Sequence, residues 1–126
     1  MLDLPYARFL GATIAEGDDP TLLVLPYRDA LEGRPDFLHG GAIGGFLEVA
    51  SIVALRHALG EESHARIKPI NLTVDYMRGG RERPTYGRGI VTRLGTRVAN
   101  VDASAWQDDP TKPIAMTRMN SLIVRE

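Results

Sequence analysis

The sequence predicts an α+β domain in which a curved antiparallel sheet wraps one long central helix. Two observations carry this prediction. The apolar side chains of a helix over residues 39–59 cover nearly its whole circumference, and four strand-like segments follow it without an intervening helix. A helix that is apolar on all sides is expected to be buried on all sides. Strands in direct succession most often pair antiparallel. A chain of 126 residues suits one domain, spanning 1–126.

Before the long helix, the pattern predicts a short helix and a hairpin. The short helix covers residues 5–10 and begins with a proline, which is favoured in a first helical turn. Residues 11–17 and 21–27 are predicted to be two strands around a turn of two aspartates and a proline. Residues 28–38 contain a glycine and a proline, so we expect a loop there with at most one helical turn.

After the long helix, the pattern predicts the sheet. Gly60 stands where a helix-ending glycine is expected. Strands are predicted at 70–77, where Ile70, Leu72, Val74 and Tyr76 alternate with polar residues and Met77, and at 85–94, 97–107 and 113–124. Small residues share one face of the third of these strands and would let the helix approach closely: Ala99, Val101, Ala103 and Ala105.

Composition excludes several classes of function. With 15 Lys+Arg against 16 Asp+Glu the net charge is −1, which argues against nucleic acid or an anionic membrane as the main partner. The absence of cysteine excludes disulfides and thiolate chemistry, and the three histidines lack metal-ligand spacing, so no metal site is expected. The acidic start predicts no signal peptide. Charged residues break the most apolar stretch, so no membrane span is expected. The predicted location is cytoplasmic.

The segment that begins the long helix is the most informative one. A loop delivers His39, Gly40 and Gly41 to the first turn, where backbone N–H groups lack helical partners and the helix dipole adds partial positive charge. Glycine lets a carbonyl oxygen approach those amides, as oxyanion stabilisation requires. The alternative is close packing, because Gly40 and Gly44, like Gly41 and Gly45, are four residues apart. Both interpretations stay open.

Glu48 follows Gly40 by eight residues, a little over two turns of helix. Its neighbours are apolar, and an ionised carboxylate in such surroundings is costly unless it is paired. Glu48 is therefore a candidate general base or nucleophile at a subunit interface. The alternative is a side of the helix that reaches solvent at Glu48, Ser51, Arg56 and His57.

Four arginines gather in a short segment after the predicted strand at 70–77: Arg78, Arg81, Arg83 and Arg88. Such a cluster is most often a solvated rim. It is also suited to a phosphorylated ligand, because arginine pairs well with phosphate. The sequence contains no nucleophile-elbow, dinucleotide-binding or zinc motif.

The string HGGAIGGFLE resembles the phenylacetate-pathway (PaaI-like) acyl-CoA thioesterases of the hotdog superfamily. Those proteins have His-Gly-Gly where the central helix begins and an acidic residue nine positions after the histidine, which is Glu48 here. The string NLTVDYMR at 71–78 resembles the strand that follows the helix in that family. The resemblance covers most of the chain. Aspartate is the usual acid in PaaI-like enzymes, whereas related hotdog thioesterases that act on aryl-CoA use glutamate.

The resemblance implies a hotdog fold and hydrolysis of an acyl- or aryl-CoA thioester without a metal or organic cofactor. The Gly40 amide would polarise the thioester carbonyl, and Glu48 would act from the facing helix across a dimer interface, either by activating water or by direct attack. His39 would help to shape the site. Such proteins are dimers, often paired into tetramers, with CoA along the interface. The expected substrate contacts are Gly41, Ser51, Arg78 and Arg81.

One departure from the family keeps other functions open. The family commonly has Asn or Gln six positions before the histidine, and this chain has Gly33. In the family this amide is thought to orient the water or the thioester carbonyl. Another group would have to do so here, and Ser51 is a candidate polar residue for the site. The principal alternative is a hotdog module that binds acyl-CoA or another lipid without catalysis. A hydratase or dehydratase of the same fold is a further alternative, disfavoured because no prolines follow His39.

Overall fold

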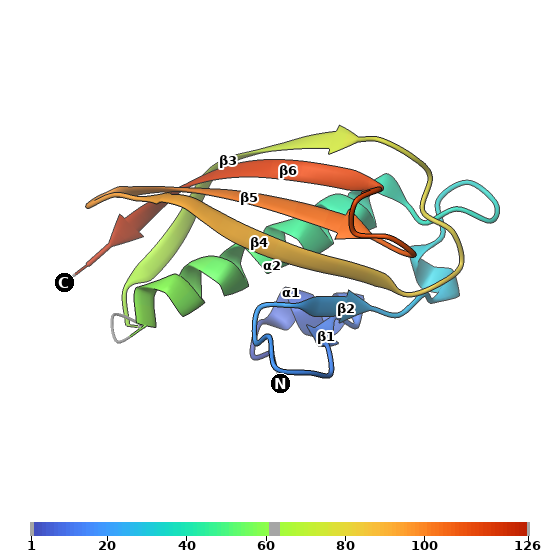
Figure 1. Ribbon diagram of the computed structural model, residues 1–126, viewed down its shortest axis with the longest axis horizontal. Coiled ribbons are helices and arrows are strands. Elements are labelled where there is room, and N and C mark those ends of the chain that lie inside the picture. Colours follow the sequence, from blue (N-terminus) through green and yellow to red (C-terminus); the bar gives the residue numbers. More distant parts are fainter. Residues whose placement is uncertain (1, 61–63, 126) are drawn as a thin grey trace.

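Helix α2, Gly40–Leu59, lies at the centre of the structure, and a curved six-stranded antiparallel sheet lies across it (Figure 1). The structure is a computed structural model that describes residues 2–60 and 64–125. The predicted α+β architecture is confirmed. The other elements are α1 Pro5–Leu10, β1 Thr13–Ile14, β2 Leu23–Leu25, a 3-10 turn Asp29–Leu31, β3 Arg66–Tyr76, β4 Thr85–Leu94, β5 Val98–Trp106 and β6 Ala115–Val124.

The strands lie in the order β1-β2-β4-β5-β6-β3, and every neighbouring pair is antiparallel. Both predicted helices and the predicted hairpin are present. β1 and β2 are shorter than predicted. Gly11 ends α1 with a φ of 87°, and Gly17 turns the chain with a φ of 126°, so little extended backbone is left between them.

Strand β3 begins at Arg66, four residues before the predicted start, and forms one edge of the sheet. A register shift between Pro69 and Asn71 interrupts its pairing with β6. The alternation of side chains therefore changes at Ile70, which is 57% exposed instead of facing the helix. The period-two pattern is readable only beyond this bulge, which explains the late predicted start.

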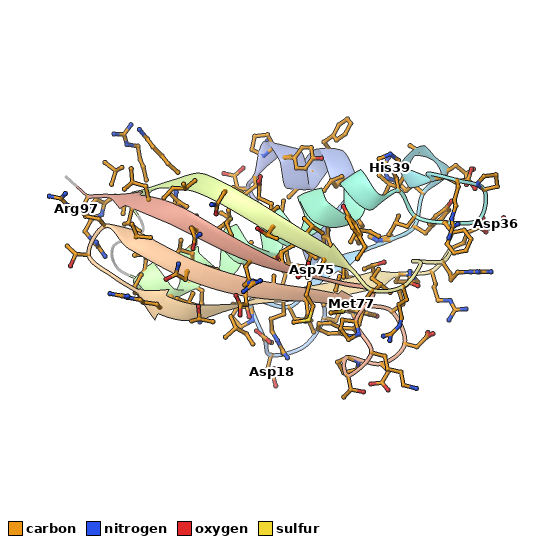
Figure 2. The ribbon with its side chains drawn as sticks, turned by 90° about the horizontal axis from the view of Figure 1, so that it is seen from above. Asp18, Asp36, His39, Asp75, Met77 and Arg97 are labelled. Atoms are coloured by element: carbon orange, nitrogen blue, oxygen red, sulfur yellow. The ribbon has the colours of Figure 1, made fainter. Side chains whose placement is uncertain are left out.

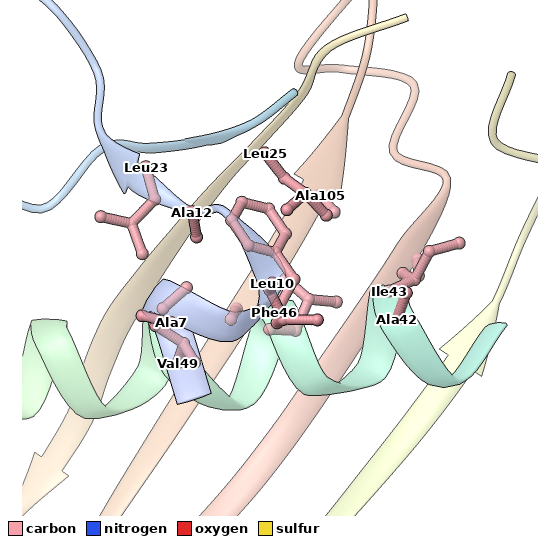
Figure 3. Packing of buried hydrophobic residues seen from close by; sticks show 14 of the residues in the cluster. Ala7, Leu10, Ala12, Leu23, Leu25, Ala42, Ile43, Phe46, Val49 and Ala105 are labelled. Atoms are coloured by element: carbon pink, nitrogen blue, oxygen red, sulfur yellow. The ribbon is translucent and has the colours of Figure 1, made fainter. Parts of the chain in front are cut away.

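The core lies between α2 and the inner face of the sheet. The predicted small face of β5 is buried against α2. On β4, an added Cβ at Gly87 would lie 2.6 Å from the Phe46 ring, and one at Gly89 would lie 2.9 Å from the Ala50 carbonyl oxygen. These two glycines let the helix approach the strand. Figure 3 shows Phe46 among the side chains of α1, β2 and β5.

The expectation that α2 is buried on all sides is only partly met. The sheet and α1 cover most of the helix, but one line of residues is exposed or half-buried: Gly41, Gly45, Glu48, Ile52 and Arg56. We call this line the open stripe. By length and composition α2 would also suit a membrane span, but 61% of its most apolar 18-residue window is buried inside the protein, as in a core helix.

Candidate active site

His39 is the N-cap of α2, and its imidazole takes part in the cap. Its backbone is extended (φ −64°, ψ 134°), and its Nδ1 accepts a hydrogen bond from the Gly41 N–H at 2.8 Å. The His39 N–H donates to the Leu31 carbonyl at 2.7 Å, which fixes the loop against the helix. An imidazole whose Nδ1 accepts this bond carries its hydrogen on Nε2 when neutral. In this position His39 caps the helix through Nδ1.

Within residues 2–60 and 64–125, the first turn of α2 leaves one backbone donor without an acceptor. The N–H groups of Ala42 and Ile43 donate to the His39 carbonyl, and the Gly41 N–H is taken by the His39 ring. Among the residues that the structure describes, the Gly40 N–H has no acceptor. Gly41 is also an expected substrate contact, and His39 already accepts a hydrogen bond from its N–H.

The glycines of this turn also serve packing. An added Cβ at Gly40 would lie 3.3 Å from the Tyr76 ring, and one at Gly44 would lie 3.4 Å from the Tyr76 hydroxyl. Gly45 faces Tyr6 of α1, where an added Cβ would lie only 2.8 Å from the ring. Packing explains Gly45, whereas an added Cβ at Gly44 would lie at an ordinary contact distance. Gly40 combines a close ring contact with an N–H that has no acceptor among the described residues.

A pocket of about 520 Å³ opens at this end of α2. Its walls are the first turn of the helix, the loop at 33–38, and the segment at 76–80 that ends β3. Figure 2 shows His39 and Met77 at the same end of the molecule, opposite Arg97. The polar side chains in its walls include Arg34, whose guanidinium carbon lies 3.9 Å from the centre of the Phe37 ring. The pocket therefore gathers a helix N-terminus, a cation and apolar walls.

Sequence reasoning did not assign Arg34, Phe37 or Tyr76 to the site. Arg34 and Phe37 are in the loop that the sequence predicts, but nothing in their spacing shows that they fold back onto the helix start. The Tyr76 hydroxyl donates to the Gly40 carbonyl at 2.8 Å, a contact between residues 36 positions apart. The string at 71–78 was a usable signal, because it already singled out this strand.

Two of the four clustered arginines are occupied by carboxylates. Arg83 pairs with Asp108 at 2.6 Å, and Arg88 of β4 pairs with Asp19 in the hairpin turn at 3.0 Å. Hydrogen bonds from the hydroxyl and N–H of Thr21, with a further one from Arg88, lower the pKa of Asp19 to about 2. The Asp19 carboxylate therefore keeps its charge at neutral pH, and Arg88 stays paired.

The two arginines predicted to contact substrate lie nearer the pocket. Arg78 lines the pocket and donates to the Pro113 carbonyl at 3.0 Å. Arg81 lies 4.6 Å from the Phe37 ring centre. Both border an adjoining hollow of about 230 Å³, together with Lys112. Among the described residues, neither Arg78 nor Arg81 forms an ion pair with a carboxylate.

Glu48 lies on the open stripe and is half-buried. Within the described ranges 2–60 and 64–125 its carboxylate has no hydrogen-bond or ion-pair partner. Eight residues of helix separate it from Gly40 by about 12 Å. The two groups of one chain are therefore too far apart to act on one carbonyl carbon.

Ser51 differs from expectation. It was expected to help at the site or to reach solvent, but its side chain is fully buried and its hydroxyl donates to the Leu47 carbonyl at 2.9 Å. An added Cβ at Gly89 of β4 would lie 3.2 Å from the Ser51 Cα. The sheet therefore covers Ser51, and its hydroxyl bonds within α2.

The space around residue 33 explains why a glycine stands there. An added Cβ there would lie 2.9 Å from the His39 Cα and 3.3 Å from its Cβ. The Gly33 N–H also donates to the Phe37 carbonyl at 2.8 Å and closes the loop. A side chain at this position would displace His39, so this chain cannot place an amide group there without moving the cap.

The fold and this site together define a hotdog protein whose central helix begins in a pocket with a free backbone donor. Residues 36–114 match the family model described as the thioesterase superfamily. The chain belongs to the thioesterase superfamily, and its fold is the hotdog fold.

Solved structures of other proteins share this fold. A Chromobacterium violaceum protein is 36% identical, with a TM-score of 0.73, over 95% of this chain and 83% of that one. A phenylacetic acid degradation-related protein from Ralstonia eutropha JMP134 is 23% identical, with a TM-score of 0.82, over 96% of this chain and 92% of that one. A Bacillus halodurans protein crystallised with CoA is 15% identical, with a TM-score of 0.81, over 94% and 75%. A comparison with curated proteins gives no match.

Proposed function

We propose that this protein hydrolyses an acyl- or aryl-CoA thioester at a site shared by two chains. The observation that carries the proposal is the free Gly40 N–H, which stands at the start of a 20-residue helix beside a pocket of about 520 Å³. Membership of the thioesterase superfamily supports the reaction class. A fold alone does not define an activity, so the proposal rests on this donor and on Glu48.

The chemistry follows from these two groups. The thioester oxygen accepts a hydrogen bond from the Gly40 N–H, and the helix dipole stabilises the negative charge that develops on it. The Glu48 carboxylate of a second chain takes a proton from water as the water oxygen bonds to the carbonyl carbon. The C–S bond then breaks, the thiolate of CoA takes up a proton, and the free acid leaves. Direct attack by Glu48 would give the same products through an anhydride that water then cleaves.

A second chain is required because Gly40 and Glu48 of one chain are too far apart. Strand β3 is the proposed contact between the two chains, because it is an 11-residue edge strand with one side unpaired among the described residues. Such an edge readily pairs with another strand. Pairing of two β3 strands would place two sheets side by side and bring the open stripes of two α2 helices toward each other. The proposed unit is a homodimer, which a tetramer would retain.

Arg78 and Arg81 are the proposed contacts for the phosphates of CoA. Arg78 borders the pocket and its adjoining hollow, and Arg81 borders the hollow. Neither has a carboxylate partner among the described residues. Arg83 and Arg88 are less suited, because their guanidinium groups are already paired. The CoA bound in the B. halodurans structure is consistent with this ligand class.

The test is a hydrolysis screen of short, medium and aromatic acyl-CoAs with wild-type protein and Glu48→Gln. We expect wild type to release CoA and Glu48→Gln to lose at least about 100-fold in kcat while the oligomer survives, because the amide cannot accept the proton. Glu16→Gln, a matched change at an exposed glutamate in the hairpin loop, should leave kcat unchanged. Full activity of Glu48→Gln would contradict the assigned role.

A second candidate function is acyl-CoA binding without hydrolysis. The observation that favours it is Gly33, which leaves no room for the amide side chain common in the family. Calorimetric binding of CoA thioesters by wild-type protein, with no release of CoA across the whole panel, would support this function over the first.

A further inference from the structure

The peptide group between Gly40 and Gly41 is fixed at both ends by side chains. Its carbonyl oxygen accepts a hydrogen bond from the Tyr76 hydroxyl at 2.8 Å. Its N–H donates to His39 Nδ1 at 2.8 Å. The two partners come from different parts of the chain: His39 is the helix cap, and Tyr76 is the last residue of β3.

The Tyr76 ring also packs on the helix that its hydroxyl reaches. Added Cβ atoms at Gly40 and Gly44 would lie 3.3–3.4 Å from ring atoms or the hydroxyl. The ring therefore lies against the first two turns of α2, with its hydroxyl bonded to the Gly40 carbonyl. Tyr76 is 56% exposed and lines the pocket, so it is held by these contacts and not by deep burial.

Two consecutive glycines make this turn conformationally permissive. Glycine has wide freedom in φ and ψ, and the first turn of a helix is short of hydrogen bonds. Two peptide planes meet at Gly40. The plane that carries the Gly40 N–H is held at the His39 carbonyl by the N–H groups of Ala42 and Ile43, and the Gly40–Gly41 plane is held by Tyr76 and His39. The Tyr76 bond therefore limits rotation at Gly40 between these two planes, and this rotation sets the direction of the free N–H. A donor stabilises a developing oxyanion only when it is oriented before the reaction.

We infer that Tyr76 is a positioning residue: its hydroxyl bond to the Gly40 carbonyl fixes the first turn of α2 so that the Gly40 N–H points at the thioester oxygen. This inference rests on the proposed function. It assigns Tyr76 no contact with the reacting atoms. Its effect is on the transition state, where charge on the oxygen is greatest, and not on ground-state binding of the substrate.

The test is Tyr76→Phe, which removes the hydroxyl and keeps the ring. We expect kcat to fall about tenfold with KM changed less than about twofold, because a misdirected donor affects the transition state more than binding. Tyr86→Phe is the matched control. Tyr86 stacks on Trp106, and its side chain lies on the outward face of β4. This variant should leave both constants unchanged.

Nuclear magnetic resonance supplies a readout besides activity. Loss of a hydrogen bond to the Gly40 carbonyl should shift the amide nitrogen resonance of Gly41 in Tyr76→Phe and leave it unshifted in Tyr86→Phe. A kcat equal to wild type, or an unshifted Gly41 resonance, would overturn the inference. A tenfold rise in KM at constant kcat would overturn it too, because the hydroxyl would then bind substrate. A wild-type protein that hydrolyses no thioester would overturn the proposed function and this inference together.

Discussion

Gly40 is the residue at which packing and chemistry meet. The sequence left two interpretations of the glycines open, and the structure divides them between residues. Gly44 and Gly45 contact aromatic side chains, whereas Gly40 contacts Tyr76 and also presents a free N–H among the described residues. Gly40 can therefore serve two purposes: it leaves space for the Tyr76 ring, and it provides a backbone N–H for the substrate.

Substitution of Gly40 can separate these two requirements. Gly40→Ala adds a Cβ beside Tyr76 and keeps the N–H. Gly40→Pro adds similar bulk and removes the N–H, at a first-turn position where proline is tolerated. We expect kcat of Gly40→Pro to be about 100-fold below that of Gly40→Ala, the usual cost of a lost oxyanion donor.

Steady-state kinetics with an acyl-CoA, alongside circular dichroism to verify the helix, would measure this difference. Equal rates for the two variants would mean that the Gly40 N–H does not act in the reaction, and the glycine would be explained by packing alone.

At the scale of elements, α2, β4 and the α1 helix were predictable because local signals define them. Gly60 ends α2, and its N–H bonds the Arg56 and His57 carbonyls. The start of β3 was not predictable, because the bulge at Pro69 and Asn71 changes which face each residue occupies. A bulge depends on the partner strand, which a local pattern does not contain.

The site divides in the same way. His39, Gly40 and Glu48 could be proposed from one contiguous motif. Tyr76 joins them only through the folded sheet. Ser51 was misplaced because spacing along a helix says which residues share a side, and not which strand covers that side. Its burial beneath β4 is a tertiary fact.

The contact of α2 with β4 predicts a stability difference between two glycines. Gly89→Ala should lower the free energy of unfolding by about 1–3 kcal/mol, because its Cβ would meet backbone and Ala54 at 2.9 Å. Gly44→Ala should be neutral or stabilising by up to about 1 kcal/mol, because alanine favours helix and the nearest atom lies at an ordinary contact distance. Urea denaturation of both variants would test this, and a larger loss in Gly44→Ala would contradict it.

At the scale of the whole molecule, the proposed shared site predicts complementation between inactive chains. A mixed dimer of Glu48→Gln and Gly40→Pro contains one site with an intact Gly40 from one chain and an intact Glu48 from the other. Random exchange of equal amounts should therefore restore about a quarter of wild-type activity, because half of the dimers are mixed and half of their sites are intact.

The measurement is hydrolysis after the two inactive proteins are mixed, unfolded in denaturant and refolded together. Each variant refolded alone is the control. Activity no higher than the controls would place both groups in a single chain or remove one of them from the mechanism.

Strand β3 takes part in two features at once: the exposed edge of the sheet and the start of α2. Its free edge is the proposed meeting line of two chains, and its last residue, Tyr76, bonds the Gly40 carbonyl. If β3 pairs in this way, dilution would separate each Glu48 from the Gly40 of its partner chain. It would also leave β3 unpaired, and the Tyr76 bond to the Gly40 carbonyl would then be weaker. Turnover per chain would then fall on dilution for two reasons. Protein concentration would set both the fraction of dimers and the orientation of the oxyanion donor within each chain.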